Sequence, residues 1–364
     1  MQHLYLHVPF CSRRCSYCDF AIAVRQRVPA RAYLDAVRAE LALVAPDLEG
    51  LRTLYLGGGT PSHLPSEALA SLLECFPSTD LDLEVTLEAN PEDVTPEAAA
   101  SWRRLGITRV SLGAQSFDDR ALAWMHRVHT AKETERAFAT LRRAGFTNIS
   151  LDLIFALPAE LERDWPRDLE CAIALEPTHL SLYGLTVEPR TPLARWVSRG
   201  ASSAPDDERY ADEYLTAHAV LARSGFEFYE VSNAARGYRS RHNSAYWSGR
   251  PYLGLGPAAH SFDGTTRRWN LAAWEAYRRA LALGRLPLES EERLTETLRE
   301  LERRYLALRT IEGLERSAFS NEQLRRWTAA GWVRLEADRV SCTPEGWLRL
   351  DALVADLTGP QGTS

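Results

Sequence analysis

Apolar and polar residues divide the first half of the chain into two kinds of segment. Short apolar runs have the length of buried strands; they are Leu4–Val8, Thr53–Leu56, Leu83–Glu88, Arg109–Leu112, Ile149–Ile154 and His179–Tyr183. Longer segments between them carry apolar residues at helical spacing; they are Ala30–Val44, Ser66–Cys75, Thr95–Leu105, Ala131–Ala144 and Asp164–Ala174. Six β-α units in series predict an α/β fold with a parallel sheet covered by helices. Six units rather than eight indicate a partial (β/α)6 barrel that is open on one side.

The pattern changes after residue 190. A stretch rich in Pro, Ser and Arg, residues 189–207, predicts a link, and a helix over Glu208–Ser224 and a strand over Phe226–Val231 follow it. We therefore expect a barrel core over residues 1–190 and an extension of the barrel over residues 191–288.

The last part of the chain predicts a small, mostly helical module over residues 289–364. Its expected elements are helices over Glu291–Leu308 and Asn321–Gly331, a hairpin of residues 333–336 and 339–342, and a last helix over Pro344–Leu357. This order of elements resembles a winged-helix fold. Because the same stretch carries many acidic residues, we interpret it as a packing or partner-docking module rather than a DNA-binding one.

Charge and composition exclude several classes of function. The 364 residues have a formal net charge of -6, so no general basic surface for nucleic acid is expected. The apolar runs are far shorter than the roughly 20 residues of a membrane span, and no signal peptide opens the sequence. Free clustered cysteines predict a reducing, cytoplasmic compartment.

A short loop after the first predicted strand carries three cysteines, Cys11, Cys15 and Cys18, at the spacing C-x3-C-x2-C. Soft thiolate ligands select zinc, copper(I) or an iron–sulfur cluster. Three cysteines are one fewer than a fully ligated cluster uses, so one iron of a cubane would stay open. A zinc site with His3 or His7 as the fourth ligand remains an alternative. The scattered Cys75, Cys171 and Cys342 are expected to be small buried apolar residues.

Glycines and polar residues mark the ends of the following strands. Gly57-Gly58-Gly59-Thr60-Pro61 follows the second strand, and it lacks the Lys of a phosphate-binding P-loop. Glu88 ends the third strand, Gln115 follows the fourth, and Asp152 lies within the fifth. Because ligands of parallel sheets bind at the carboxyl ends of the strands, we expect these residues to share one site.

The cysteine spacing with an aromatic residue, Tyr17, before the last cysteine resembles the radical S-adenosylmethionine superfamily, and the glycine segment resembles its GGGTP motif. The resemblance implies a [4Fe-4S] cluster held by Cys11, Cys15 and Cys18, with S-adenosylmethionine chelating the open iron. It implies further S-adenosylmethionine contacts at Tyr5, Tyr17, Gly58, Gly59, Thr60, Glu88, Gln115, Arg127 and Asp152, and an adenine pocket at Tyr183 and Thr186. His126 and His129, which flank Arg127, are interpreted as ordinary polar residues.

A second informative segment lies in the barrel extension, where His242 and Asn243 precede Tyr246 and Trp247. Judged by residue type alone, Tyr246 and Trp247 fit packing on the barrel edge. An imidazole with two flat rings also suits a flat macrocycle. The string is similar to the HNxxYW heme-binding motif found among relatives of the oxygen-independent coproporphyrinogen III oxidases, which implies a heme site at these four residues with His242 as the axial ligand.

The following segment, residues 252–261, contains G-x-G-x-x-A, which is a weak dinucleotide signal outside a βαβ unit. By the same resemblance it closes over the cofactor side of the barrel. His260, in this segment, is given no role.

Two functions follow from the resemblance. The first is a heme chaperone that carries the cluster and S-adenosylmethionine and hands heme to acceptor proteins such as respiratory enzymes. The second is a coproporphyrinogen III dehydrogenase that decarboxylates propionates through a 5′-deoxyadenosyl radical. Phe20 stands where that enzyme has a fourth cysteine, and Cys11 lies near the N-terminus; both features favour the chaperone. The resemblance also leaves room for a homodimer and for peripheral contact with membrane partners.

Overall fold

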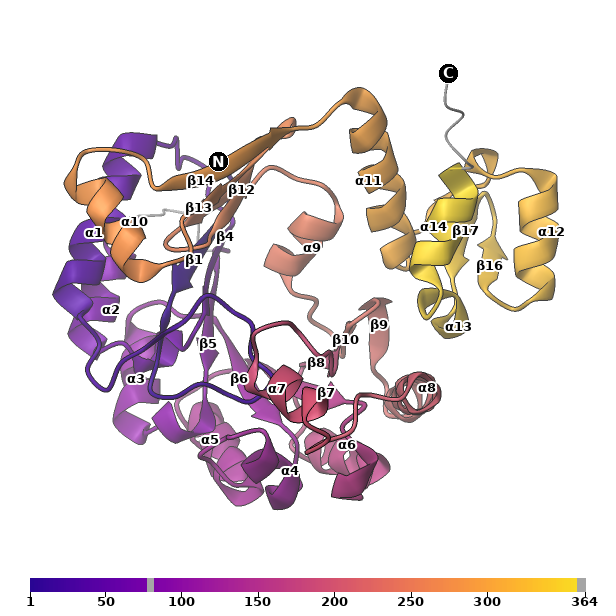
Figure 1. Ribbon diagram of the computed structural model, residues 1–364, viewed down its shortest axis with the longest axis horizontal. Helices are drawn as coiled ribbons and strands as arrows, with labels where there is room; N and C mark the ends of the chain where they lie inside the picture. The colour runs from indigo at the N-terminus through magenta and orange to yellow at the C-terminus, as the bar shows by residue number, and fades with distance from the viewer. Residues whose placement is uncertain (77–81, 359–364) are drawn as a thin grey trace.

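A nine-stranded sheet organises the molecule, in the order β11-β1-β4-β5-β6-β7-β8-β10-β9. The computed structural model describes residues 1–76 and 82–358. The six central strands are parallel; they are β1 (His3–Val8), β4 (Thr53–Gly58), β5 (Glu84–Ala89), β6 (Arg109–Gln115), β7 (Asn148–Phe155) and β8 (His179–Gly184). All six were predicted from their apolar runs. The sheet curves without closing, which confirms the partial barrel (Figure 1).

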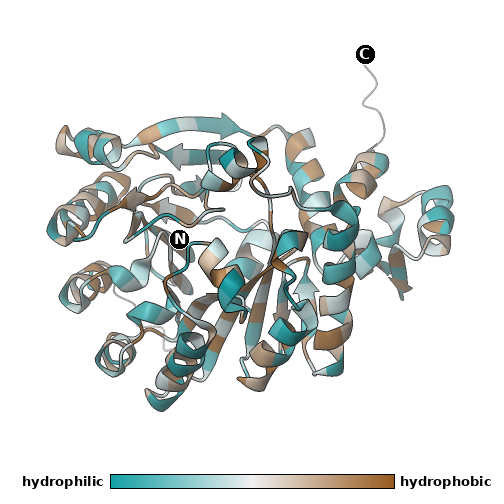
Figure 2. Ribbon diagram, turned by 60° about the horizontal axis from the view of Figure 1, so that its bottom comes forward, coloured by the Kyte–Doolittle hydropathy of each residue, from teal (hydrophilic) through white to brown (hydrophobic). Residues whose placement is uncertain are grey.

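The two faces of the central strands carry different residues because side chains alternate along a strand. Leu4, Leu6 and Val8 of β1 belong to the buried apolar core, as do Leu54 and Leu56 of β4. The residues between them are aromatic or polar and occupy the inner face of the barrel. Figure 2 shows this as strands banded in brown and paler shades inside a rim of helices with teal outer faces.

Helices follow the strands and cover the outer face of the sheet (Figure 1). They are α1 (Ala30–Val44), α2 (Ser66–Leu73), α3 (Pro96–Arg104), α5 (Ala131–Arg143) and α6 (Trp165–Ala174). Their starts follow helix-capping chemistry: Thr130 and Glu133, for example, form a reciprocal capping box at the start of α5. The short helices α4 (Asp119–Trp124) and α7 (Pro192–Ser198) were not predicted, and α7 lies in the stretch expected to be a link.

The barrel extension widens the sheet at both edges. Helix α8 (Asp207–Arg223) leads into β9 (Glu227–Glu230) and β10 (Asn233–Ala235), which pair antiparallel beside β8. Strand β11 (Leu253–Leu255) pairs parallel with β1 at the other edge. The segment that contains G-x-G-x-x-A therefore begins in an edge strand of the barrel and continues as the connection to β12 (His260–Phe262).

A second sheet and two helices complete the extension. Helix α9 (Arg241–Trp247) precedes β11, and β12 (His260–Phe262), β13 (Thr266–Asn270) and β14 (Leu288–Arg293) form a three-stranded antiparallel sheet with α10 (Trp274–Ala282) between its last two strands. The prediction of a helix from Glu291 was wrong at its start. Residues 291–293 pair with β13, and α11 (Glu296–Arg309) begins after the N-cap residue Thr295.

The C-terminal module stands at one end of the molecule, where α11 joins it to the barrel (Figure 1). Strands β15 (Leu314–Glu315), β16 (Val333–Glu336) and β17 (Arg339–Cys342) form a small sheet beside α12 (Asn321–Ala329), and β16 and β17 are the predicted hairpin. The last predicted helix is two helices, α13 (Pro344–Trp347) and α14 (Leu350–Thr358). Within the described part of the chain, none of the helices has the length and apolar character needed to cross a membrane.

Candidate functional site

The three clustered cysteines lie in a loop at the carboxyl end of β1. A two-strand ladder of β2 (Phe10–Cys11) and β3 (Ala23–Val24) closes the base of this loop. The Thr60 hydroxyl donates to Cys11 Sγ at 3.3 Å, and Arg127 Nη1 donates to Cys15 Sγ at 3.7 Å. Burial raises the pKa of the Cys11 thiol to about 11 and that of the Cys18 thiol to about 12. Metal coordination would deprotonate such thiols, so the environment fits metal ligands better than free nucleophiles.

Close packing explains Gly58, the last residue of β4, and Gly59, which follows it. A Cβ at Gly59 would lie 2.8 Å from the Pro9 carbonyl carbon and 3.0 Å from Cys11 Sγ. Gly58 has φ +111, and its Cβ would lie 2.6 Å from the His7 ring. Gly59 therefore lets the chain after β4 pack against the cysteine loop, and Gly58 lets the end of β4 pack against His7 of β1; a larger residue would push either contact apart.

Buried polar groups from β5, β6 and β7 face the same space. Glu88 accepts hydrogen bonds from the Tyr55 hydroxyl at 2.8 Å and from the Gly58 amide at 3.0 Å, and burial raises its pKa to about 7. Asp152 accepts from the Ser111 hydroxyl at 3.0 Å, and burial raises its pKa as well. Each carboxyl group is therefore held in place but costly to ionise without a ligand.

Arg127 crosses the space between the cysteine loop and the strand ends. Its Nη2 donates to Asn90 Oδ1 at 2.5 Å and to the Gly113 carbonyl at 3.0 Å, while Nη1 reaches Cys15. Gln115 has φ +66 at the end of β6, and its amide packs over Gly113. The strand-end residues thus converge, as the parallel-sheet rule predicts.

A cavity of about 350 Å³ collects these groups. Its lining includes Cys11, Cys15, Tyr17, Cys18, Gly58, Gly59, Thr60, Glu88, Gln115, Arg127, Asp152, Tyr183 and Thr186. Tyr5 is the exception among the residues predicted for S-adenosylmethionine, because it lines a second cavity and its hydroxyl pairs with His7 Nδ1 at 3.1 Å. His126 lies on the wall of the first cavity, and buried His129 pairs with the Ala114 carbonyl and with Glu92.

The arrangement fits a cluster better than a single metal ion. Among residues 1–76 and 82–358, no three His, Cys, Asp or Glu side chains converge on one ion-sized point. The thiolates of a cubane bind three different irons, so they need not meet at one point. The histidines considered for zinc lie elsewhere: His3 Nδ1 pairs with Thr53, and both nitrogens of His7 are engaged, by Tyr5 and by the Ala21 carbonyl.

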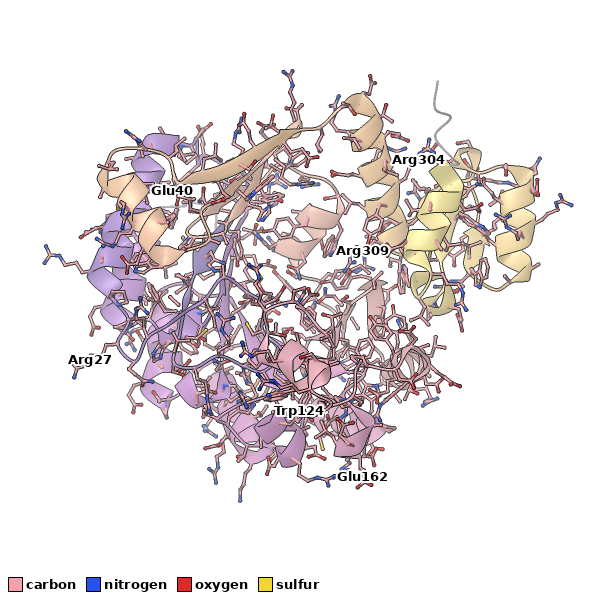
Figure 3. All side chains as sticks on the ribbon, in the orientation of Figure 1. Arg27, Glu40, Trp124, Glu162, Arg304 and Arg309 are labelled. Carbon is pink, nitrogen blue, oxygen red and sulfur yellow. The ribbon has the colours of Figure 1, made fainter. Side chains whose placement is uncertain are left out.

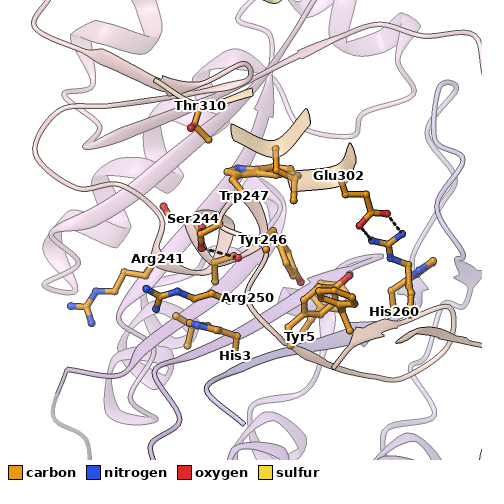
Figure 4. Close-up of a pocket in the computed structure, with 18 of the residues that line it drawn as sticks. His3, Tyr5, Arg241, Ser244, Tyr246, Trp247, Arg250, His260, Glu302 and Thr310 are labelled. Atoms are coloured by element: carbon orange, nitrogen blue, oxygen red, sulfur yellow. Dashed lines mark hydrogen bonds and ion pairs between the residues drawn. The ribbon is translucent and has the colours of Figure 1, made fainter. Parts of the chain in front are cut away.

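The second cavity is larger, about 1350 Å³, and lies along the open side of the barrel between α9, β12 and α11 (Figure 4). Tyr246 and Trp247 of the predicted heme motif line it, with Tyr5, Tyr252, Phe262 and Phe20 as further aromatic lining. Eight arginines and three glutamates also line it, in a chain whose net charge is -6. The side chains of Arg52, Arg250 and Arg299 make no hydrogen bond or ion pair within the described ranges. The cavity therefore suits a flat, anionic ligand.

His242 and Asn243 do not line this cavity. His242 is 1% exposed; its Nδ1 pairs with Thr53 Oγ1 at 2.8 Å and its Nε2 with the Tyr246 hydroxyl at 2.8 Å. Burial lowers the pKa of His242 to about 3, so the ring is neutral and uses both nitrogens within the protein. In this conformation His242 fixes the position of Tyr246 and offers no free nitrogen to the cavity.

Sequence reasoning missed several polar residues of the barrel interior. Thr53 joins His3 to His242, Asn90 accepts from Arg127, and buried Arg109 contacts His179 at 3.3 Å. The sequence did carry a signal for these residues: polar side chains occur at every second position in strands that are otherwise apolar. Arg109 and Ser111 in β6 are an example.

The fold and the cysteine-bearing cavity define a radical S-adenosylmethionine protein. The model of the Radical SAM superfamily matches residues 5–172, and this class implies a [4Fe-4S] cluster and S-adenosylmethionine. A protein called heme chaperone HemW from Mycobacterium tuberculosis is 41% identical over 98% of this chain and 94% of its own length. The Bacillus subtilis protein of the same name is 34% identical over 88% of this chain and 87% of its own. The chain belongs to the HemW family of this superfamily.

A solved structure supports the same fold. Coproporphyrinogen III oxidase (HemN) from Escherichia coli superposes with a TM-score of 0.81 over 97% of this chain and 89% of that protein, at 22% sequence identity. At that identity the likeness concerns the fold alone.

Proposed function

We propose that this protein is a heme chaperone that binds heme in the cavity of about 1350 Å³ and passes it to heme-accepting proteins. The relatives of the same family that bear the name heme chaperone extend over nearly the whole chain. The observation that carries the proposal is the lining of the cavity, which combines flat aromatic side chains with an excess of five positive charges.

Heme is a flat macrocycle with two propionate groups, and both features have counterparts in this lining. The rings of Tyr246 and Trp247 offer apolar faces to the porphyrin. The guanidinium groups of Arg250 and Arg299 are without protein partners in the described ranges, so they are available to pair with propionates.

The HNxxYW motif serves this site through its aromatic half. His242 holds the Tyr246 hydroxyl at 2.8 Å, while the Arg309 guanidinium lies 4.1 Å above the Trp247 ring. Arg309 in turn pairs with buried Glu230 at 2.8 Å. The rings of Tyr246 and Trp247 are therefore each fixed by a contact within the protein, so they form a rigid, preorganised surface for a flat ligand.

The smaller cavity would hold the cluster and S-adenosylmethionine. We assign Cys11, Cys15 and Cys18 to the cluster, and Gly58, Gly59, Thr60, Glu88, Gln115, Arg127 and Asp152 to S-adenosylmethionine, with Tyr17 packed beside them. The thiols held protonated by burial and the close glycine backbone fit these groups. When bound, the cluster and S-adenosylmethionine supply one-electron chemistry, and the chain positions and shields them.

The position of the larger cavity would allow heme to pass directly to an acceptor protein. This cavity lies on the open side of the barrel and is bounded by α11, the helix that connects to the C-terminal module (Figure 1). An acceptor protein that docks on this side would meet both the cavity mouth and the module, so heme could move without release into water.

Hemin titration of the reconstituted protein, followed by the Soret band, tests the proposal. Wild type should bind one hemin, and Arg250→Glu should weaken binding by at least about tenfold, because it places a negative charge where a propionate would bind. Arg31→Glu is the matched control, since that side chain is 96% exposed on the outer helix α1. Equal affinity in the three proteins would contradict the proposed cavity.

The dehydrogenase alternative is tested in the same anaerobic preparation. Coproporphyrinogen III is added with S-adenosylmethionine and a strong reductant, and decarboxylated porphyrin is measured. We expect none to form. Stoichiometric decarboxylation would overturn the chaperone assignment.

A further inference from the structure

Three histidines, His3, His7 and His260, line the large cavity. A heme-iron ligand needs an imidazole nitrogen with a free lone pair that the cavity can reach. His7 engages both nitrogens, and the unpartnered Nε2 of His3 is covered by surrounding atoms. His260 is exposed, and its ring nitrogens make no hydrogen bond within residues 1–76 and 82–358.

The backbone of His260 is held in place by two strands. His260 begins β12 and pairs with Trp269 of β13. Its carbonyl oxygen packs so closely on β11 that a Cβ at Gly254 would come within 2.0 Å of it. Gly254 in turn pairs with Tyr5 of β1, so the main chain of His260 is fixed to the barrel edge.

The imidazole ring is oriented as well. It stacks on the Trp269 indole with ring centroids 5.7 Å apart and an angle of 19° between the planes. The neighbouring Arg267 is engaged by Glu302 of α11 through two contacts of 3.0 Å, which leaves the imidazole unpaired. His260 as a residue is exposed, but partial burial of its ring, and then the charge of Arg267, lowers the pKa of the imidazole, so its lone pair is available at neutral pH.

The position of His260 also suits the rest of the ligand. In Figure 4, His260 and Arg241 lie at opposite sides of the cavity, with Tyr246 and Trp247 between them. His260 therefore lies in the same cavity as the rings that would contact a macrocycle, and on the side away from Arg241.

We propose that His260, rather than His242, supplies the axial ligand to heme iron in this cavity. The proposal rests on the proposed function. It divides the roles between the two histidines: His260 binds the iron from the barrel edge, and His242 positions Tyr246 against the porphyrin from within α9.

The test uses reconstituted full-length protein loaded with hemin, read by the Soret band and by electron paramagnetic resonance of the ferric iron. His260→Gly should lose the spectral signature of histidine ligation, and added imidazole should restore it by filling the space left by the ring. His3→Ala should keep the wild-type spectrum. Circular dichroism and the melting temperature check that each variant is folded, and His260→Gln gives a second, less disruptive change.

The outcomes separate this proposal from the function on which it rests. Hemin uptake with an unchanged spectrum in His260→Gly and His260→Gln would overturn the ligand assignment alone. If His3→Ala lost the signature of histidine ligation while His260→Gly kept it, the assignment to His260 would also fail, and the ligand would be His3 of β1. If wild type takes up no hemin, the proposed function fails and the ligand assignment fails with it.

Discussion

The buried carboxyl group of Glu40 should make the stability of the fold depend on pH. This residue of α1 is 2% exposed, and it accepts hydrogen bonds from the Tyr277 hydroxyl at 2.6 Å and the Gly256 amide at 2.8 Å. The side-chain amide of Asn270 is a third donor. Figure 3 labels Glu40 beside α10, on the part of the molecule where α1 meets the extension. The carboxyl group thus ties the barrel core to the segment that follows β11.

The direction and the size of the pH effect on stability follow from the pKa of the Glu40 carboxyl group. Burial raises it from 4.5 to about 7, although the three donors act in the opposite direction. Between these two values the folded protein keeps the proton while the unfolded chain has lost it, so stability falls as pH rises. The loss is complete above pH 7. The difference, 7 − 4.5 = 2.5 pKa units, corresponds to about 3 kcal/mol at 1.36 kcal/mol per unit.

Glu40→Gln isolates this contribution, because glutamine does not ionise. The side-chain amide of the glutamine would also face the amide donor of Asn270. The destabilisation from this contact is the same at every pH. We expect the free energy of unfolding of the variant, relative to wild type, to rise by about 3 kcal/mol between pH 4.5 and pH 8. Chemical denaturation at both pH values, followed by near- and far-ultraviolet circular dichroism, measures it. A relative change below about 1 kcal/mol would refute the reasoning.

Two further substitutions test the cofactor cavity and the buried charges. Gly59→Ala should abolish cluster assembly, because its Cβ would collide with the cysteine loop 3.0 Å from Cys11 Sγ; wild-type iron and sulfide content after reconstitution would contradict this. Arg163→Met should destabilise the fold by about 3–5 kcal/mol, because it takes the guanidinium partner from buried Asp168 and leaves Glu213 paired with Arg209 alone. In Arg167→Met, the exposed control, the unfolding midpoint should stay at the wild-type value, and equal midpoints for the two variants would argue against a role for burial.

The parallel strands were predictable because each is buried on both sides and reads as an apolar run. Strand β14 was missed for the opposite reason: all six of its residues are exposed, and it forms through pairing with β13. Strand β11 has three residues, and what holds it is β1, some 250 positions earlier in the chain. Neither short edge strands nor exposed ones carry a hydrophobic period that single-sequence reasoning can detect.

The same limit of single-sequence reasoning explains why the residues of the smaller cavity could be predicted together, whereas the orientation of His242 could not. Residues of the smaller cavity follow successive strands, so the rule for parallel sheets brings them together from sequence alone. The orientation of His242 depends on Thr53, a residue 189 positions away, and on which side of a seven-residue helix meets β4. A sequence motif identifies the residues of such a helix, but tertiary packing decides which of them face a ligand.

Phe20 connects the two sites and bears on the choice between chaperone and dehydrogenase. Its side chain is 61% exposed and lines both cavities, which also share Gly58 and Glu88. The enzyme-type motif places a fourth cysteine at this position, whereas a phenyl ring adds no metal ligand. Covering a Phe side chain with an apolar ligand is favourable by about 1.5–3 kcal/mol. At the wall between a cluster cavity and an aromatic, arginine-rich one, Phe20 offers that contact surface to a flat macrocycle, which supports a binding role for the larger cavity.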